Sequence, residues 1–194
     1  MDDHAWDLLR WAPRSKNGSA PVARWHANGI LDGRKEERER MSAENAGGSR
    51  LEAALAAFER DAAEHLTAGP AEAEELLRLE EKLHVRLPTA FRRFLERLGG
   101  GLFYERHEIF GAHRVLIHDI EMVPDLVSFC RRIEADGDAC ARRFLPFHRA
   151  GSVVHLLDVS NPDALSPAVR SLDGSESYPD FVAFLQTLTP PRDV

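Results

Sequence analysis

The sequence predicts an α+β domain in which helices flank a central, mostly antiparallel sheet. Helical periodicity marks both ends of the region between residues 70 and 190, while short β-like stretches fill its middle. These stretches come in runs and do not alternate one by one with helices, as the strands of a parallel sheet would. We therefore place the domain at residues 70–190, with a helical N-terminal extension at residues 51–69 and a poorly ordered arm at residues 1–50.

Two helices that meet at a proline are predicted at the start of the domain. Leucines recur every three or four positions in residues 76–83, and phenylalanines and leucines do the same in residues 91–98. Pro88 suits the first turn of the second helix, where its missing N–H leaves no hydrogen bond unmade. The glycines at 99–101 end that helix, because glycine readily adopts the left-handed conformation of a helix C-cap.

The rest of the domain is predicted to hold short strands around one helix, followed by a closing helix. Helical spacing indicates helices at residues 121–135, with Pro124 in the opening turn, and at residues 178–188. The expected strands are residues 102–104, 109–110, 114–117, 144–147, 152–159 and 169–172. The inward faces predict a core that includes Leu79, Leu83, Phe91, Phe94, Leu95, Phe129, Ile133, Phe147, Leu157, Phe181 and Leu185.

The first 50 residues differ in composition from the domain. They contain all three tryptophans, Trp6, Trp11 and Trp25, and a charged run at residues 34–40. The sequence Ala-Gly-Gly-Ser at residues 46–49 is typical of a flexible linker. A poorly ordered arm and a docking segment for a partner both fit this composition.

An amphipathic helix is predicted between this arm and the domain, at residues 51–66. Its apolar residues recur on one face, and Ser49 and Glu52 have the spacing of a capping box. The pair Gly69-Pro70 is expected to end the helix.

Composition and charge favour a cytoplasmic protein that binds other proteins. The net charge of −7 argues against direct nucleic-acid binding, which needs a basic surface, and is compatible with a basic partner. No apolar run approaches the length of a membrane helix, and the acidic N-terminus lacks the basic start of a secretory signal. We expect Cys130 and Cys140 to be reduced, with Cys130 in the core. The oligomeric state stays open.

The reactive side chains predict no enzyme and no catalytic, cofactor-binding or metal site. His107, His113 and His118 lie near Asp119 in the sequence, but their spacing does not match that of zinc ligands. We interpret these histidines as structural. Gly-Ser at residues 151–152 lacks the surrounding pattern of a serine hydrolase, and the triple glycine lacks the lysine of a phosphate-binding loop.

Acidic residues in the β-rich middle form a candidate partner-binding face, for which ordinary solubility is the alternative interpretation. Complementary charge speeds association and suppresses wrong partners, while aromatic side chains supply binding energy. The candidate residues are Phe103, Tyr104, Glu105, Glu108, Phe110, Asp119, Glu121 and Asp125.

Four features follow one another along residues 71–188. They are a helix with Leu79-Glu80 before Leu87-Pro88, a helix that ends in Gly99-Gly100, Leu145-Pro146-Phe147 leading through Gly151 into a strand that ends at Asp158, and a closing helix from Ser177 to Leu185. In this order and spacing, the region resembles the SUKH superfamily, whose members carry the Smi/Knr-type domain.

The resemblance implies a SUKH-like α+β domain without catalytic residues. It also implies an immunity-type protein that binds a cognate bacterial polymorphic toxin, often a nuclease, and blocks it by occlusion. On this interpretation the partner is a protein toxin, and the acidic chain suits a basic one. The alternative is a non-enzymatic regulatory or scaffold module that binds other proteins.

Overall fold

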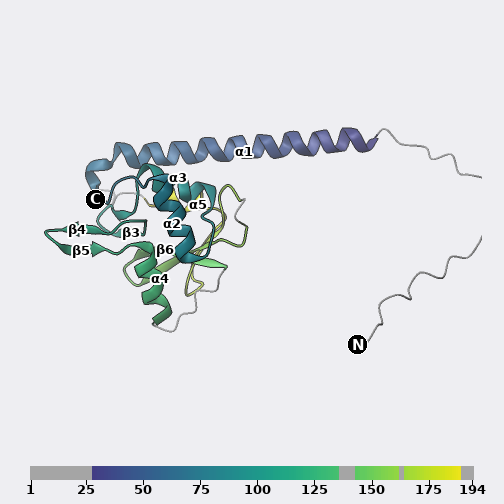
Figure 1. Cartoon of the computed structure of the whole chain (residues 1–194). Coiled ribbons are helices and arrows are strands. Elements are labelled where there is room, and N and C mark those ends of the chain that lie inside the picture. The colour runs from purple at the N-terminus through teal and green to yellow at the C-terminus, as the bar shows by residue number, and fades with distance from the viewer. Residues whose placement is uncertain (1–27, 136–142, 162–163, 189–194) are drawn as a thin grey trace, which may run out of the picture. The chain divides into compact units, whose positions relative to one another are not determined.

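The computed structural model describes residues 28–135, 143–161 and 164–188 (Figure 1). The chain divides into two units, residues 1–38 and residues 39–194. The described part of the first unit is the beginning of helix α1 (Asn28–Arg60), and the second unit contains the rest of this helix and all other described elements. None of the described helices is long and apolar enough to cross a membrane.

A seven-stranded sheet forms the centre of the second unit, and among the described residues every pairing within it is antiparallel. This arrangement confirms the predicted fold class. In spatial order the strands are β1 (His65–Thr67), β2 (Gly101–Phe103), β3 (His107–Ile109), β6 (Phe144–Ala150), β7 (Val153–Asp158), β8 (Val169–Ser171) and β9 (Ser177–Tyr178).

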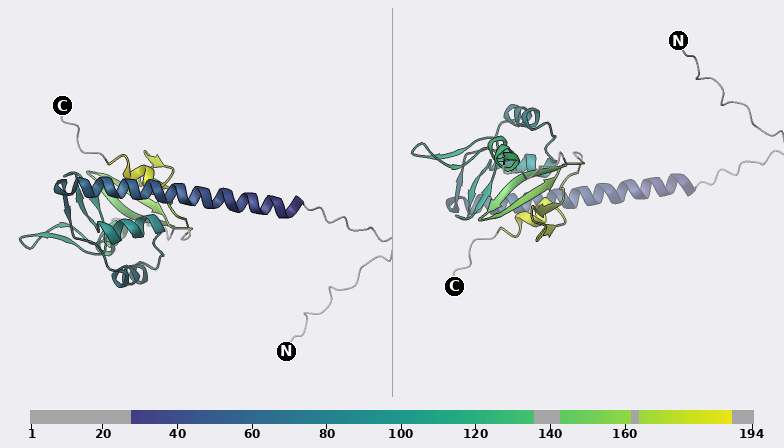
Figure 2. Two further views of the ribbon diagram at one scale, coloured as in Figure 1. Left: turned by 90° about the horizontal axis from the view of Figure 1, so that it is seen from above. Right: turned by 90° about the horizontal axis from the view of Figure 1, so that it is seen from below.

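A second, two-stranded sheet lies between β3 and β6 in the chain. It consists of β4 (Val115–Ile117) and β5 (Ile120–Val123), which pair antiparallel as a hairpin (Figure 1). Figure 2 shows this hairpin extending away from the seven-stranded sheet in both of its views. The prediction of a helix from residue 121 is wrong at its start, because residues 120–123 form β5 and Pro124 precedes the helix that follows.

Side-chain caps mark the start of two helices of the second unit. Glu72 and Glu75 form a capping box at the start of one helix, and the Asp180 carboxylate accepts a hydrogen bond from the Ala183 N–H at the start of another. Pro88 occupies the N-cap position of a third helix. After α1 the described helices are η1 (Ala62–Glu64), α2 (Ala73–Leu83), α3 (Thr89–Arg97), α4 (Leu126–Ala135) and α5 (Phe181–Leu185).

One hydrophobic core connects the helices to the sheet. Phe91 on α3 meets Phe147 on β6 and Phe181 on α5 edge to face, each pair with ring centroids 5.6 Å apart. Every predicted core residue is buried except Leu83, which is partly buried and packs against this core. The predicted burial of Cys130 is also confirmed. Helical periodicity therefore identified the inward faces correctly.

The expected linker at residues 46–49 is wrong, because α1 runs through it without a break. A Cβ atom on Gly47 would lie 2.9 Å from the Leu165 side chain, so glycine permits a close approach at this point of the helix. The prediction that a helix begins near Ser49 fails for the same reason. Residues 1–27 of the predicted arm, with the three tryptophans, lie outside the described residues.

The predicted helix at residues 51–66 ends early, at Arg60, and residues 65–67 form strand β1. His65 pairs with Phe103 and Thr67 with Gly101 on β2, so sheet hydrogen bonds replace the helical ones. Leu51, Leu55 and Phe58 are almost wholly buried in the common core. The second half of α1 is therefore built into the domain.

Candidate protein-interaction site

The β4–β5 hairpin turns on two residues with positive φ. His118 has φ 49° and Asp119 has φ 65°, which is the left-handed region at both central positions. A two-residue hairpin turn of this kind matches the right-handed twist of the strands and favours residues that tolerate positive φ. Asp and His are among the non-glycine residues found there most often. The sequence therefore builds a tight turn at this point.

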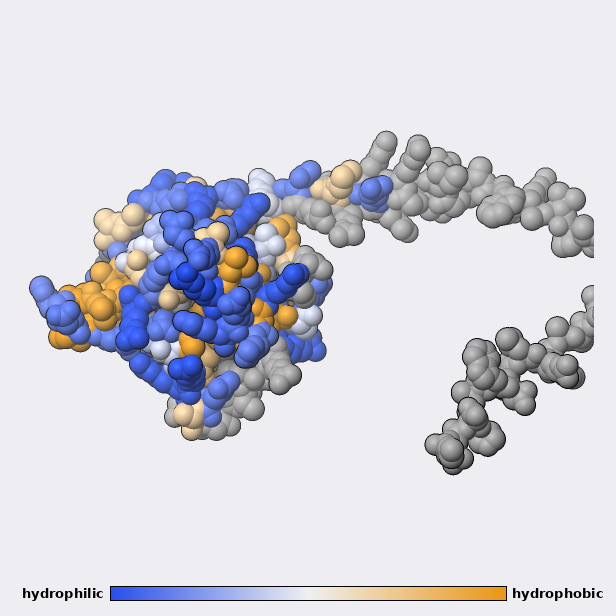
Figure 3. All heavy atoms as spheres, viewed as in Figure 1, coloured by the Kyte–Doolittle hydropathy of each residue, from blue (hydrophilic) through white to orange (hydrophobic). Residues whose placement is uncertain are grey.

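The hairpin carries an exposed cluster of large apolar side chains. Ile120 is 66% exposed, Leu116 54%, Met122 43% and Ile117 37%. Figure 3 shows a group of hydrophobic side chains over β4 and β5, next to the hydrophilic tip. Contiguous apolar surface on an otherwise polar protein marks a site where another molecule binds. We call these four residues the hairpin cluster.

The strand register divides the hairpin cluster between two faces. Ile117 lies opposite Ile120, so their side chains share a face, and Met122 lies at the register shift that follows on β5. Leu116 lies opposite Glu121, on the other face. One face of the hairpin is thus wholly apolar near the tip, while the other is mixed.

The base of the hairpin is fixed to the domain. Val115 and Val123 lie opposite each other and are almost fully buried. Arg114 pairs with Asp125 at 3.4 Å, and Glu121 pairs with Arg132 on α4 at 2.5 Å. The apolar tip is therefore held in place by a buried base and by ion pairs.

Three of the five predicted acidic residues are already engaged inside the domain. Glu108 pairs with Arg149 at 2.6 Å, and Glu121 pairs with Arg132. Burial raises the pKa of Asp125, but hydrogen bonds from Ser128 and the charge of Arg114 outweigh it and leave this pKa below its usual value. These carboxylates are therefore partly neutralised by their neighbours.

The other two acidic residues, Glu105 and Asp119, are exposed and lie in different turns. Glu105 is in the turn between β2 and β3, and Asp119 is at the tip of the hairpin beside the hairpin cluster. The structure thus does not gather the acidic series into one patch.

The predicted aromatic anchors belong to the core. Phe103 and Phe110 are fully buried, and Phe110 stacks on Phe129 with ring centroids 3.7 Å apart. Tyr104 is 5% exposed, and its hydroxyl donates to Asp61 at 2.9 Å. The expectation that these three side chains face a partner is wrong, because Phe103 and Tyr104 pack against α1 and Phe110 packs against α4.

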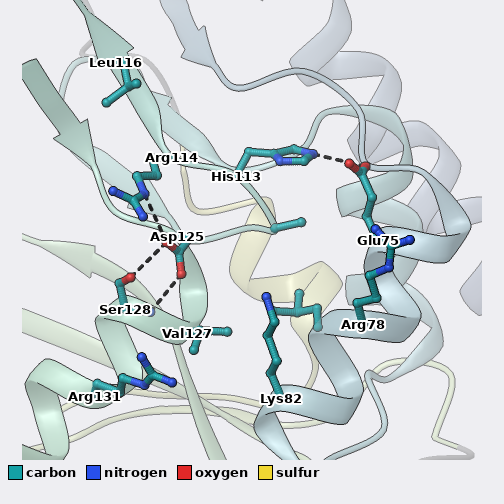
Figure 4. A pocket seen from close by; sticks show the side chains of 12 residues that line it. Glu75, Arg78, Lys82, His113, Arg114, Leu116, Asp125, Val127, Ser128 and Arg131 are labelled. Carbon is teal, nitrogen blue, oxygen red and sulfur yellow. Dashed lines mark hydrogen bonds and ion pairs between the residues drawn. The ribbon is translucent and has the colours of Figure 1, made fainter. Parts of the chain in front are cut away.

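A groove of about 740 Å³ lies beside the hairpin, between α2, the segment 112–116 and the start of α4 (Figure 4). Its apolar lining comes from Leu79, Ala112, Leu116 and Val127. Its charged lining is mostly cationic and consists of Arg78, Lys82, Arg114 and Arg131 with the acids Glu75 and Asp125, and His113 adds an imidazole. No local sequence pattern indicates this groove, because its lining comes from segments that are distant in the chain.

The two acids of the groove are held by residues of the domain itself. Glu75 accepts the Glu72 N–H at 2.8 Å and lies 3.1 Å from His113 Nε2 (Figure 4). The hydrogen bond from Glu72 is the main cause that lowers the pKa of Glu75, and His113 adds to it. The Ser128 N–H and hydroxyl both donate to Asp125 at 2.8 Å. The groove therefore keeps its carboxylates charged and occupied.

Three histidines on neighbouring strands form a hydrogen-bonded chain through the sheet. His107 Nδ1 lies 3.2 Å from His148 Nε2, and His148 Nδ1 lies 3.0 Å from His155 Nδ1. His155 Nε2 then lies 3.0 Å from a Glu176 oxygen, which also accepts the Tyr178 hydroxyl. Among the described residues, no group of three or more His, Cys, Asp or Glu could hold a metal ion.

Burial controls the protonation of this histidine chain. It lowers the pKa of His148 to about 2, with a further contribution from the neighbouring histidines. Burial and the charge of Arg106 lower the pKa of His107 to about 4. Both rings are therefore neutral near pH 7, and their hydrogen bonds link β3, β6 and β7.

Comparison with known families supports the fold. A family model described as SUKH_5, SMI1-KNR4 cell-wall, matches residues 52–189. This match covers most of the chain and includes the C-terminal end of α1, the seven-stranded sheet and the hairpin. A comparison with curated proteins gives no match. The chain belongs to the SMI1-KNR4 family of SUKH domains.

Proposed function

We propose that this protein is an immunity-type protein that binds a cognate bacterial toxin in the cytoplasm and blocks it by occlusion. Membership of the SUKH family is consistent with a role in protein–protein interaction. The observation that carries the proposal is the hairpin cluster, whose large apolar side chains are exposed on a hairpin with a buried base. Blocking requires only that the hairpin covers the working surface of the toxin, so no catalytic residue is needed.

The hairpin cluster has the properties of an interface core. A few large side chains near the centre of an interface supply most of its binding energy. Ile117 and Ile120 lie directly opposite each other, and a partner that covers both removes a continuous apolar surface from water. Because the ion pairs of Arg114 and Glu121 hold the hairpin before binding, little conformational entropy is lost when the complex forms.

Charge supports a basic toxin as the partner. The chain has a net charge of −7, and Asp119 lies at the hairpin tip between the two isoleucines. Opposite charge at the edge of an interface mainly raises the association rate. Of the predicted acidic face, we therefore retain Asp119 as the residue best placed to steer the toxin.

The test is co-expression with the products of adjacent genes. The proposal expects that one neighbouring gene encodes a toxin, that this protein rescues cells from it, and that the two proteins purify together. Unrelated toxins serve as the control and should not be neutralised. If no adjacent product is toxic or bound, and a regulatory protein is captured in its place, the chain is a regulatory or scaffold module.

A further inference from the structure

We infer that the groove between α2 and α4 binds an acidic segment of the partner that also carries apolar side chains. The inference rests on the proposed function in one respect, which is that the partner is a protein. It adds a second contact beside the hairpin cluster, with the opposite charge preference to Asp119. Leu116 belongs to both surfaces, so the hairpin cluster and the groove can form one continuous footprint.

The groove has an excess of positive charge. Arg78 and Lys82 lie one helical turn apart on α2, and Arg131 lies across the groove on α4 (Figure 4). Arg114 adds a fourth permanent cation at the end near the hairpin. The two carboxylates, Glu75 and Asp125, already accept hydrogen bonds from groups of the domain. Four permanent cations against these two carboxylates give the lining a net positive charge.

The cations of the groove are largely available to a ligand. Neither Lys82 nor Arg131 has an ion-pair partner among the residues that the structure describes, and both are exposed. Arg78 pairs with Glu74 on the solvent side of α2, where both side chains are mostly exposed. Exposed pairs of this kind are weak and exchange easily. An incoming carboxylate can therefore form ion pairs with these cations at little cost in free energy.

The floor of the groove indicates an apolar component in the ligand. Leu79 is buried there, and Val127 and Ala112 are partly buried. Between the cationic walls this floor suits a chain that directs apolar side chains inward and carboxylates to either side. The volume of about 740 Å³ lies within the range of about 300–1,000 Å³ seen for ligand sites, and is enough for a few residues.

An acidic peptide fits better than a nucleic acid or a small anion. A nucleic acid needs a broad basic footprint, whereas this chain has a net charge of −7. A small anion needs donors that converge on one point, but the cations here stand on opposite walls of an open groove. Spread cations over an apolar floor match a short extended segment. Charge complementarity of this kind would fix the register of the partner.

The experiment uses a fluorescent peptide of about eight residues in which Asp alternates with Leu, because apolar and acidic side chains are then both present. Control peptides replace Asp with Asn or with Lys. We expect the Asp peptide to bind the full chain about tenfold tighter than the Asn peptide, and the Lys peptide to bind least. Anisotropy at low and at physiological salt should show affinity falling with salt.

Matched variants separate the groove from general electrostatics. The double variant Lys82→Glu with Arg131→Glu should bind the Asp peptide about tenfold or more weakly than the unmodified protein. Arg86→Glu with Arg106→Glu makes the same charge change at exposed residues outside the groove lining and should have little effect. Equal binding of the Asp and Asn peptides, or equal losses in both double variants, would overturn the inference.

The peptide measurement needs no toxin, so its outcome does not depend on the proposed function. A toxin that is bound and neutralised equally well by the groove variants would refute the groove contact and leave the immunity function intact. Conversely, specific binding of the Asp peptide would support the groove contact even if no adjacent gene product is toxic. The absence of a toxic neighbour would then refute only the immunity function.

Discussion

Ile117 and Ile120 lie directly opposite each other across the β4–β5 hairpin, and both side chains are open to solvent. A paired apolar contact of this kind stabilises a sheet when it is covered, but Ile120 is 66% exposed and Ile117 37% exposed in the described structure. The pair lies next to a tight turn and above a buried valine pair at the hairpin base. Under the proposed function, this pair is where the partner binds the tip.

The second half of α1 should be necessary for stability, because its apolar face is part of the core. Leu55 is fully buried, so Leu55→Ala is expected to lower the free energy of unfolding by about 2–5 kcal/mol. Leu77→Ala is the matched control, since Leu77 is 54% exposed and its loss should cost less than about 0.5 kcal/mol. Urea unfolding measures both. Equal small losses would mean that α1 packs only loosely.

An ion-pair network should tie α1 to α3. Arg97 bonds both oxygens of Glu59, at 2.9 Å and 2.5 Å, and lies 2.6 Å from Glu52. All three side chains are partly exposed, so we expect Arg97→Ala to cost only about 1 kcal/mol, or about 2–4 °C in thermal midpoint. Arg93→Ala, which removes one longer contact of 3.4 Å, should shift the midpoint less. Loss of the difference at high salt would identify the effect as electrostatic.

The histidine chain should make the fold sensitive to mild acid. In the unfolded chain a histidine has a pKa near 6.5, whereas burial lowers the pKa of His107 to about 4 and that of His148 to about 2. Between the folded and the unfolded pKa of each group, the unfolded state binds more protons than the folded state. The free energy of unfolding is therefore at its full value above about pH 6.5 and falls as the pH drops toward 4. Each of the two groups should contribute a loss of up to about 2 kcal/mol between pH 7 and pH 5.

Urea unfolding at pH 7, 6 and 5 measures this effect. This pH range lies above the pKa values of ordinary carboxylates, so a fall in the free energy of unfolding within it reports on histidine. His148→Leu should lower stability at pH 7, because it removes the hydrogen-bond partner of His107 Nδ1 and of His155 Nδ1, and should reduce the loss between pH 7 and pH 5. His118→Asn, at the exposed hairpin turn, keeps a residue that tolerates positive φ and should keep the full pH dependence. An unchanged pH slope in His148→Leu would contradict the account.

Helical periodicity predicted the core well because it depends on local spacing alone. In an α-helix of normal pitch, Phe91, Phe94 and Leu95 lie on one face, and all three are buried. The strands were less certain, because a short apolar run does not show which side a neighbour covers. The sequence therefore predicts Phe103 and Phe110 at the surface, whereas β1, α1 and α4 bury them.

The candidate site could be predicted only in part from the sequence. The region around Asp119 and Glu121 was identified, but the helical spacing of residues 121–135 concealed β5 and with it Ile120 and Met122. The contact between His148 and His155 depends on a register shift between Pro146 and His148, which no local pattern reveals. The groove likewise depends on how α2 and α4 pack, since its cations are scattered along the chain.

The most direct test of the central claim is the affinity of the toxin for a hairpin variant. Ile120→Thr with Met122→Thr keeps β-branched or small polar residues on β5 while removing most of its exposed apolar surface. Leu172→Thr, at an exposed leucine outside the hairpin, is the control. Titration calorimetry should show affinity reduced by about a hundredfold in the double variant and unchanged in the control, because interface anchors carry about 2 kcal/mol or more. Equal affinity of both variants and the unmodified protein would contradict binding through the hairpin.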